Sequence, residues 1–308
     1  MPLFIFISGM NAYASCAKAQ TLDFRKTLKR VGRIIVPYMV SVLLYLIAAE
    51  GFVDVRTYLN YVIHFNITPP HYFVLFFSQL LLVAPIMVRL IQKAKALPRG
   101  REVMAQILII AGGILLAYFT MNYTYVLKVY GGGKYLLGGT FLVIFLWGMQ
   151  AAGYDLFRFR WLRSVITFLV SAVLWVIWWR VLCSHQAEID ALIPFGPGDP
   201  PSISLTVLAF LMLIVVYSGT AFLQKISWLS FLPKAFAWIG RHSLYIFLYH
   251  FLIINYCIKP YFKMENPYLQ LVVYLAGAIL GPVGIECIFK TIKGWITKDT
   301  TDPAINAA

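Results

Sequence analysis

Long apolar stretches with few charges are the feature of this sequence that most restricts its fold. Most of them extend for about 18 residues or more, which is enough for an α-helix to cross a hydrocarbon core about 30 Å thick. Their apolar character is continuous and does not alternate, which argues against a β-barrel. The sequence therefore predicts an all-α fold, a polytopic transmembrane helical bundle of about nine spans. The expected spans are 1–16, 34–53, 71–92, 104–123, 137–152, 161–182, 203–223, 236–258 and 268–291.

The composition agrees with a membrane protein. Hydrophobic residues make up 61% of the chain and charged residues only 12%, whereas about a quarter of the residues of a soluble domain are charged. The formal net charge is +14, which in a soluble protein would favour nucleic-acid binding. In a membrane protein, basic residues orient the helices and contact anionic lipid headgroups. We therefore expect membrane lipid, and not nucleic acid, as the partner of these charges.

Lysine and arginine residues are concentrated in alternate connections between the expected spans. About 20 of the 26 lie in or beside the segments 17–33, 89–103, 153–163 and 224–236, or near the end of the chain. Cytoplasmic loops of membrane proteins are enriched in these two residues. We therefore expect these segments and the C-terminus to face the cytoplasm, and the N-terminus to lie outside.

The first apolar run has no basic leader before it and no small-residue cleavage site after it. It is therefore predicted to be an ordinary span and not a signal peptide. A span that enters from the outside without a leader is awkward to insert alone, and an earlier inside-to-outside helix, missing from this sequence, would resolve the difficulty. Residues 1–295 are predicted to form a single transmembrane domain, and residues 296–308 a disordered cytoplasmic tail.

A cluster of basic residues stands at the cytoplasmic mouth of the second span, in KTLKRVGRIIVPY. Arg30 and Arg33 are three residues apart and share one face of a helix, with Lys29 beside them. Two hypotheses explain the cluster. It anchors the span and contacts phospholipid, or its guanidinium groups hold the phosphates of a cytoplasmic ligand bidentately.

Two histidines are candidates because they lie at or within expected spans. His71 opens the third span at the outer face, with Gln79 about two turns deeper, and His250 follows Tyr249 within the eighth span. Polar side chains at membrane depth usually face the bundle interior or a water-filled cavity. A headgroup contact for His71 and a structural hydrogen bond for His250 are the alternatives.

Three further polar residues belong to the last two spans. Arg241 and Ser243 lie near the inner end of the eighth span, and Glu286 is a carboxyl group within the ninth. A carboxylate in hydrocarbon needs a partner. An arginine or lysine of another span is the expected partner of Glu286.

Sequence motifs of the common soluble enzymes are absent. There is no GxSxG, HExxH, Walker loop or GxGxxG. The four cysteines have no metal-binding spacing and are predicted to be buried, inert thiols, although a disulfide between Cys183 and Cys257 remains open. We expect no metal and no bound cofactor.

Four segments, in order along the chain, resemble motifs of the acyltransferase 3 family of integral membrane acyltransferases. PLFIFISGM, with Ser8 in its Ser-Gly pair, is similar to that family's second helix. KRVGRIIVPY resembles its Arg-x-x-Arg motif, HYFVLFFSQLLLVAPIM its His-Leu-Trp-Phe segment, and FAWIGRHSLYIFLYHFLII its late helix. Family members have a core of ten helices, the first of which carries a histidine thought to act as catalytic base. The resemblance implies that this sequence begins after that helix, so that histidine cannot be assigned to any residue here.

The resemblance also implies a function. It is the transfer of an acyl group, most simply acetyl, from cytoplasmic acyl-CoA to a hydroxyl of a cell-surface or exported polysaccharide, at a bacterial inner (plasma) membrane. Arg30, Arg33 and Lys29 are the expected donor-binding residues, and His71 and His250 the expected catalytic residues on the acceptor side. The expected supporting polar residues are Ser8, Gln79, Arg241, Ser243, Tyr249 and Glu286. A transporter or flippase of sugars or lipid-linked sugars and an inactive truncated remnant are the alternatives. The acceptor sugar and the oligomeric state stay open.

Overall fold

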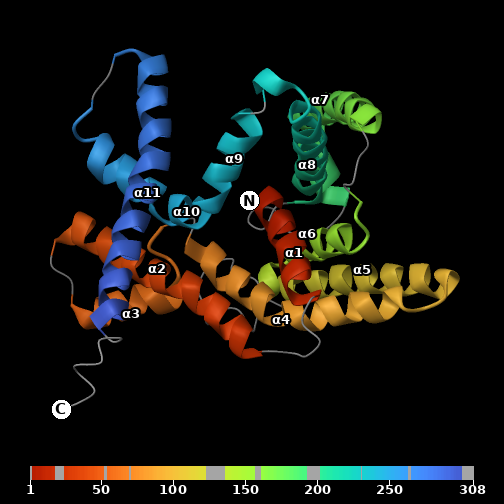
Figure 1. Ribbon diagram of the computed structural model, residues 1–308, viewed down its shortest axis with the longest axis horizontal. Helices are drawn as coiled ribbons and strands as arrows, with labels where there is room; N and C mark the ends of the chain where they lie inside the picture. Colours follow the sequence, from red (N-terminus) through yellow and green to blue (C-terminus); the bar gives the residue numbers. More distant parts are fainter. Residues whose placement is uncertain are drawn as a thin grey trace. The chain divides into compact units, whose positions relative to one another are not determined.

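The computed structural model describes residues 2–17, 24–51, 54–68, 71–122, 136–156, 161–192, 202–229, 231–262 and 265–299. These residues form helices, and no strand occurs among them (Figure 1). The all-α prediction is therefore confirmed. The helices are α1 (Pro2–Ala17), α2 (Phe24–Glu50), α3 (Val55–His64), α4 (Tyr72–Lys95), α5 (Arg99–Asn122), α6 (Thr140–Gly153), α7 (Trp161–Leu192), α8 (Ile203–Leu223), α9 (Phe231–Arg241), α10 (Ser243–Leu252) and α11 (Pro267–Asp299), with short 3-10 turns η3 (Leu136–Gly138) and η4 (Ser227–Leu229) and a π-helix η5 (Ile253–Ile258).

Six of the described helices are long and apolar enough to cross a membrane: α2, α4, α5, α7, α8 and α11. Helices α1 and α6 and the α10–η5 segment are apolar but shorter. The count of nine spans therefore stays a prediction. Helix α7 illustrates the membrane character, because apolar side chains such as Leu169, Val173 and Ile177 are exposed along it. Exposed apolar surface of this extent is typical of a lipid-facing helix.

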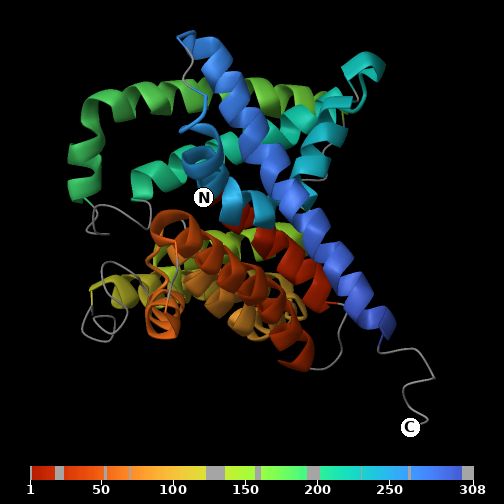
Figure 2. The same ribbon diagram turned by 90° about the vertical axis from the view of Figure 1, so that its left-hand side faces the viewer.

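Several expected boundaries differ from the observed ones. Helix α2 begins at Phe24, ten residues before the expected span, so Pro37 lies inside the helix and not near its start. The expected eighth span is divided into α9, α10 and η5, and His242 separates the first two. Helix α3 was not expected. Helix α7 bends where His185 leaves the helical conformation, which Figure 2 shows in green.

Contacts between Cα atoms divide the chain into two compact units, which we describe separately. Unit 1 consists of residues 1–33 and 72–233. In it, α1 packs on α4, α6 and α8, α5 packs on α4 and α6, and α7 packs on α8. The prediction of a single domain stays a prediction. Helix α11 extends to Asp299, into the expected tail, and residues 300–308 lie outside the described residues.

A pair of glycines brings α1 and α6 close together within unit 1. A β-carbon on Gly9 would overlap the carbonyl oxygen of Phe145, and one on Gly148 would overlap the carbonyl oxygen of Phe6. Small residues allow two backbones to approach each other in membrane proteins, where close van der Waals packing drives helix association. The Ser-Gly pair of the first helix therefore has a packing role through Gly9, and Ser8 beside it is half-buried.

Unit 2 consists of residues 34–71 and 234–308. In it, α11 packs on α10 and η5, and the side chain of Ile253 lies against Gly277 and Gly281. Helix α3 is tied to α2 by Tyr38, whose hydroxyl lies 3.2 Å and 3.1 Å from the carbonyl oxygens of Tyr61 and Val62. These contacts place α2, α3, α10 and α11 around the polar side chains of unit 2.

Candidate functional site

Arg30 in unit 1 is hydrogen-bonded to the C-terminal end of α1. Its Nη1 donates hydrogen bonds to Ser15 Oγ at 3.0 Å and to Cys16 Sγ at 3.5 Å. A helix C-terminus carries partial negative charge, so a cation is favourable there. The Nε and Nη2 donors of Arg30 make no hydrogen bond to the described residues. Arg33 and Lys29 are exposed, so this part of α2 presents basic groups that a ligand can contact.

Polar side chains from α4 satisfy helix ends near this cluster in unit 1. Gln92 Nε2 donates to the carbonyl oxygen of Ala17 at 3.2 Å, and Lys95 donates to that of Gly153. The last carbonyls of a helix lack partners within the helix. These two side chains supply partners for the ends of α1 and α6, and so fix the surroundings of Arg30.

A second group of polar side chains in unit 1 was not among the candidate site residues predicted from the sequence. Gln150 donates to Gln106 Oε1 at 3.0 Å, and the Tyr154 hydroxyl donates to Glu102 Oε1 at 2.6 Å. Burial, and then the neighbouring Glu102, raise the pKa of Tyr154 to about 12, so its hydroxyl remains a donor. An amide within an apolar run was the signal that could have identified both glutamines. Because Gln106 and Gln150 satisfy each other, we interpret them as structural.

Gln79 has a structural partner in unit 1. Its Oε1 accepts a hydrogen bond from the backbone N–H of Leu137 at 2.7 Å. Leu137 has a positive φ of 57°, which is an uncommon conformation for a branched side chain. Gln79 therefore holds the turn that precedes α6.

His71 in unit 2 is buried, and both of its ring nitrogens have partners. Nε2 lies 2.9 Å from Ser41 Oγ, and Nδ1 is hydrogen-bonded to Thr68 Oγ1. Ser41 gives its own proton to the Tyr38 carbonyl oxygen, so Ser41 Oγ accepts from Nε2–H and Nδ1 accepts from Thr68. The ring edges also contact Tyr38 and Tyr45. His71 is therefore a neutral imidazole held in the Nε2–H tautomer, with no nitrogen left for a ligand.

His250 differs because only one of its nitrogens is used within the described part of the chain. Nδ1 lies 2.9 Å and 3.0 Å from the carbonyl oxygens of Ile246 and Phe247. A carbonyl oxygen only accepts, so Nδ1 carries the proton and Nε2 has the lone pair. His250 is half-buried. Its Nε2 is therefore able to accept a hydrogen bond from a hydroxyl.

The other expected residues of the α9–α10 segment have different surroundings. Tyr249 is buried, and its hydroxyl donates to the Pro37 carbonyl oxygen at 2.8 Å, which ties α10 to α2 within unit 2. Ser243 is the first residue of α10, and Arg241 is exposed at the end of α9. Tyr249 is therefore a structural donor, since its one proton is already used.

Glu286 in α11 is the centre of a charged cluster in unit 2. Its Oε2 lies 2.6 Å from His242 Nδ1, and its Oε1 lies 2.7 Å from Lys290 Nζ. The expected partner was an arginine or lysine of another span. The structure instead pairs Glu286 with a lysine one turn along its own helix and with a histidine at the α9–α10 break. His242 was not among the selected residues, because the break that positions it was not predicted.

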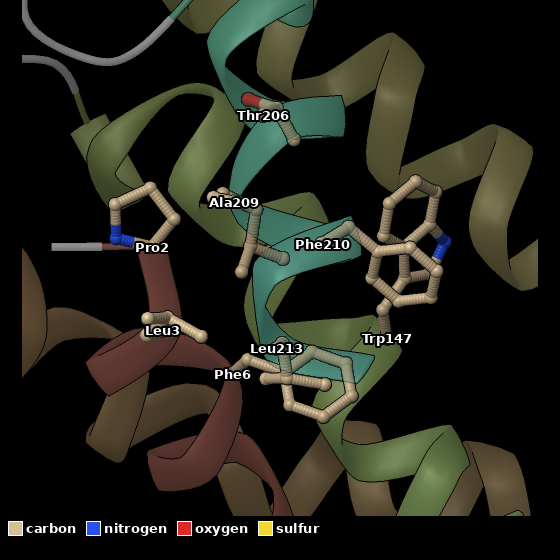
Figure 3. A pocket seen from close by; sticks show the side chains of 9 residues that line it. Pro2, Leu3, Phe6, Trp147, Thr206, Ala209, Phe210 and Leu213 are labelled. Atoms are coloured by element: carbon tan, nitrogen blue, oxygen red, sulfur yellow. The ribbon is translucent and has the colours of Figure 1, made fainter. Parts of the chain in front are cut away.

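A small apolar pocket lies in unit 1 among α1, α6 and α8. Figure 3 shows Phe6, Trp147, Phe210 and Leu213 among its side chains. The one hydroxyl that lines it, that of Thr206, is hydrogen-bonded to the Ser202 carbonyl oxygen. Its volume of about 10 Å³ holds about one water molecule. It is therefore a packing defect and not a substrate site.

The described residues contain no group of three or more His, Cys, Asp and Glu side chains that could hold a metal ion. All four cysteines are free thiols, so no disulfide joins Cys183 and Cys257, and three of the four are exposed. The prediction that they are buried is therefore wrong for Cys183, Cys257 and Cys287. These three lie on apolar helices, and the described residues do not cover their thiol groups.

Comparison with known proteins identifies a family. No curated protein and no solved structure matches the chain significantly. A family model described as an acyltransferase domain matches residues 1–287, which include α1 to α10 and most of α11. The match therefore covers both units, with the basic cluster on α2 and the histidines of unit 2. The chain belongs to the acyltransferase 3 family, and it is a membrane acyltransferase.

Proposed function

We propose that this membrane acyltransferase moves an acetyl or other acyl group from cytoplasmic acyl-CoA to a hydroxyl of a cell-surface or exported polysaccharide. The observation that carries the proposal is the family match over residues 1–287. The distribution of basic residues supports a cytoplasmic donor side and a cytoplasmic C-terminus. The location in this proposal is a bacterial inner membrane.

The donor site in this proposal is the basic cluster of α2. Arg30 is held by Ser15 and Cys16, so its Nε and Nη2 donors, which have no partner among the described residues, are already oriented before a ligand binds. Arg33 and Lys29 are exposed on neighbouring positions of the helix. A guanidinium group presents paired donors that match a phosphate, and a lysine adds a point charge. The three side chains suit the phosphates of a nucleotide-linked donor.

The acceptor side contains His250, whose Nε2 lone pair accepts a hydrogen bond from a saccharide hydroxyl. His71 supports this side as a structural residue, because Ser41 and Thr68 occupy both of its nitrogens. We thus propose that His250 contacts the ligand and that His71 has a positioning role.

The reaction has a simple balance. The hydroxyl oxygen attacks the thioester carbonyl carbon, a C–O bond forms, the C–S bond breaks, and the hydroxyl proton passes to the departing thiolate. A neutral hydroxyl is a weak nucleophile, so a general base accelerates the attack. The products are an ester and a free thiol, and no metal is needed to balance the step.

The test is mass spectrometry of surface polysaccharide from cells with the gene and cells without it. We expect an acetyl-sized mass increment to disappear when the gene is deleted and to return when it is restored. Identical polysaccharide spectra in the two strains would contradict the proposal.

A further inference from the structure

Helix α3 (Val55–His64) has no role in the proposed reaction, and none of its side chains is buried. Val55, Leu59 and Ile63 have exposed fractions of 73%, 45% and 56%. Residues four positions apart lie on the same side of a helix. These three side chains therefore form one apolar stripe on unit 2, which the described residues leave uncovered.

The opposite side of α3 is joined to α2. The Tyr58 hydroxyl donates to the Met39 carbonyl oxygen at 3.2 Å. In the other direction, the Tyr38 hydroxyl reaches the carbonyl oxygens of Tyr61 and Val62. Tyr58, Tyr61 and Val62 are half-buried. Helix α3 thus has one side held against α2 and one apolar side that faces away from it.

The junction with α3 lies within the apolar part of α2. Tyr38 and Met39 fall between Val36 and Ile47, whose side chains have exposed fractions of 56% and 50%. About three helical turns separate Val36 from Ile47, so both lie on the same side of α2. Because α2 is long and apolar enough to cross a membrane, that side faces hydrocarbon. Helix α3 is therefore joined to α2 at a depth where lipid is present.

A polar stripe runs beside the apolar one on α3. Arg56 and Asn60 are both exposed, and the side chain of Asp54 caps the helix. With ten residues, α3 is too short to cross a bilayer. A short amphipathic helix contacts acyl chains with its apolar side, while its polar side stays in water or among headgroups.

We propose that the stripe of Val55, Leu59 and Ile63 packs on the acyl chains of membrane phospholipids. The occupant of the stripe is lipid and not a second protein chain, because α2 exposes apolar side chains to hydrocarbon at the same depth. The inference goes beyond the proposed function and does not depend on the acyl donor or the acceptor.

Lipid contact on α3 also supports the buried His71. Phe65, which follows α3, stacks on Tyr38 with 4.8 Å between the ring centroids. The same Tyr38 ring contacts the ring of His71, at 5.4 Å between centroids. Lipid packed on the outward side of α3 thus holds its inner side, and Phe65 after it, against α2.

Cysteine labelling of the full chain in phosphatidylcholine vesicles tests the inference. The four native cysteines are replaced by serine, and Leu59→Cys and Asn60→Cys are made separately in that background. Asn60→Cys is the matched control, because Asn60 is the exposed neighbour of Leu59 on the polar stripe. A charged, membrane-impermeant maleimide should react with Leu59→Cys about tenfold more slowly or less, because the thiolate is the reactive form and apolar surroundings disfavour it. Equal rates at the two positions would contradict the inference.

A second measurement identifies what covers the stripe. A fluorescent nitrobenzoxadiazole label is attached to each variant in detergent before reconstitution. Phospholipids with a doxyl group on the acyl chain should quench the label on Leu59→Cys strongly and the label on Asn60→Cys weakly. Ile63→Cys, another exposed position of the stripe, should behave like Leu59→Cys.

The outcomes separate lipid from a protein partner. A Leu59→Cys thiol that is protected from the maleimide, with a label that doxyl lipid does not quench, would assign the stripe to another protein chain and overturn the inference. None of these measurements uses enzymatic activity. A failure of the inference is therefore distinct from a failure of the proposed function.

Discussion

At the scale of single residues, hydrogen-bond partners distinguish the roles of side chains that look equivalent in the sequence. His71 and His250 both occupy apolar surroundings, yet one has no free nitrogen and the other keeps a lone pair. Arg30 and Arg33 share one face of α2, yet one is tied to α1 and the other is exposed. These differences lead to separate predictions.

Arg33→Ala is expected to raise the KM for acyl-CoA by about tenfold, because a charge-assisted hydrogen bond contributes about 1.5–3 kcal/mol and about 1.4 kcal/mol corresponds to a factor of ten. Arg56→Ala, which removes an exposed arginine at the start of α3, serves as the control. Steady-state kinetics in detergent give both values. Equal KM values for the parent and Arg33→Ala would remove Arg33 from the donor site.

His71→Ala is expected to reduce stability more than chemistry. The substitution removes the hydrogen bonds of the buried ring to Ser41 and Thr68, and an intramolecular hydrogen bond contributes about 0.5–1.5 kcal/mol. The apparent melting temperature in detergent should fall, while kcat per folded molecule stays near that of the parent. A variant with full stability and no activity would show that His71 has a chemical role.

His250→Ala is expected to show the opposite behaviour. The side chain bonds only to its own helix among the described residues, so the melting temperature changes little. Loss of its Nε2 acceptor raises the KM for the saccharide. An unchanged saccharide KM would identify His250 as a packing residue.

At the scale of elements, glycine positions determine how closely helices approach. Gly148→Ala would place a β-carbon against the Phe6 carbonyl oxygen in α1, and overpacking costs about 1–3 kcal/mol. Gly112→Ala in α5 is the matched control, because a β-carbon there meets no atom within 4 Å. The first variant should lower the melting temperature and the second should not. Equal melting temperatures would mean that α1 and α6 are not in close contact.

Helix α3 depends on its N-cap. Asp54 accepts hydrogen bonds from the Thr57 hydroxyl and the Thr57 N–H, which lower the pKa of Asp54. A lowered pKa in the folded state means that the cap stabilises α3 at neutral pH and that this contribution disappears as the pH falls through the folded-state pKa. We expect Asp54→Ala to speed hydrogen exchange of α3 amides at pH 7. The difference from the parent should vanish at low pH, and a difference that persists there would exclude the carboxylate as its cause.

Helix positions were predictable from hydropathy, but helix ends were not. The apolar run that begins near Ile34 marks where α2 becomes apolar, whereas the charged residues before it continue the same helix. The break at His242 lies in the polar run Gly240–Ser243, which was interpreted as the inner end of a single span. The contact of His242 with Glu286 joins residues 44 positions apart in the sequence, and local periodicity carries no information about such pairs.

At the scale of the whole molecule, the sequence predicted the all-α class and the family, since long apolar runs and four ordered motifs extend over most of the chain. It did not predict the tautomer of any histidine, because a tautomer depends on partners from other elements. Glu286 could be selected from the sequence because the charge of a buried carboxylate needs a partner wherever the carboxylate lies.

The measurement that tests the central claim most directly uses inverted inner-membrane vesicles, whose cytoplasmic face is accessible. Vesicles that contain the protein, and matched vesicles that lack it, receive radiolabelled acetyl-CoA, and the label in the saccharide fraction is counted. We predict label in saccharide only with the protein present, and its release as acetate by mild base, as expected for an ester. Equal saccharide label in the two vesicle preparations would contradict the account.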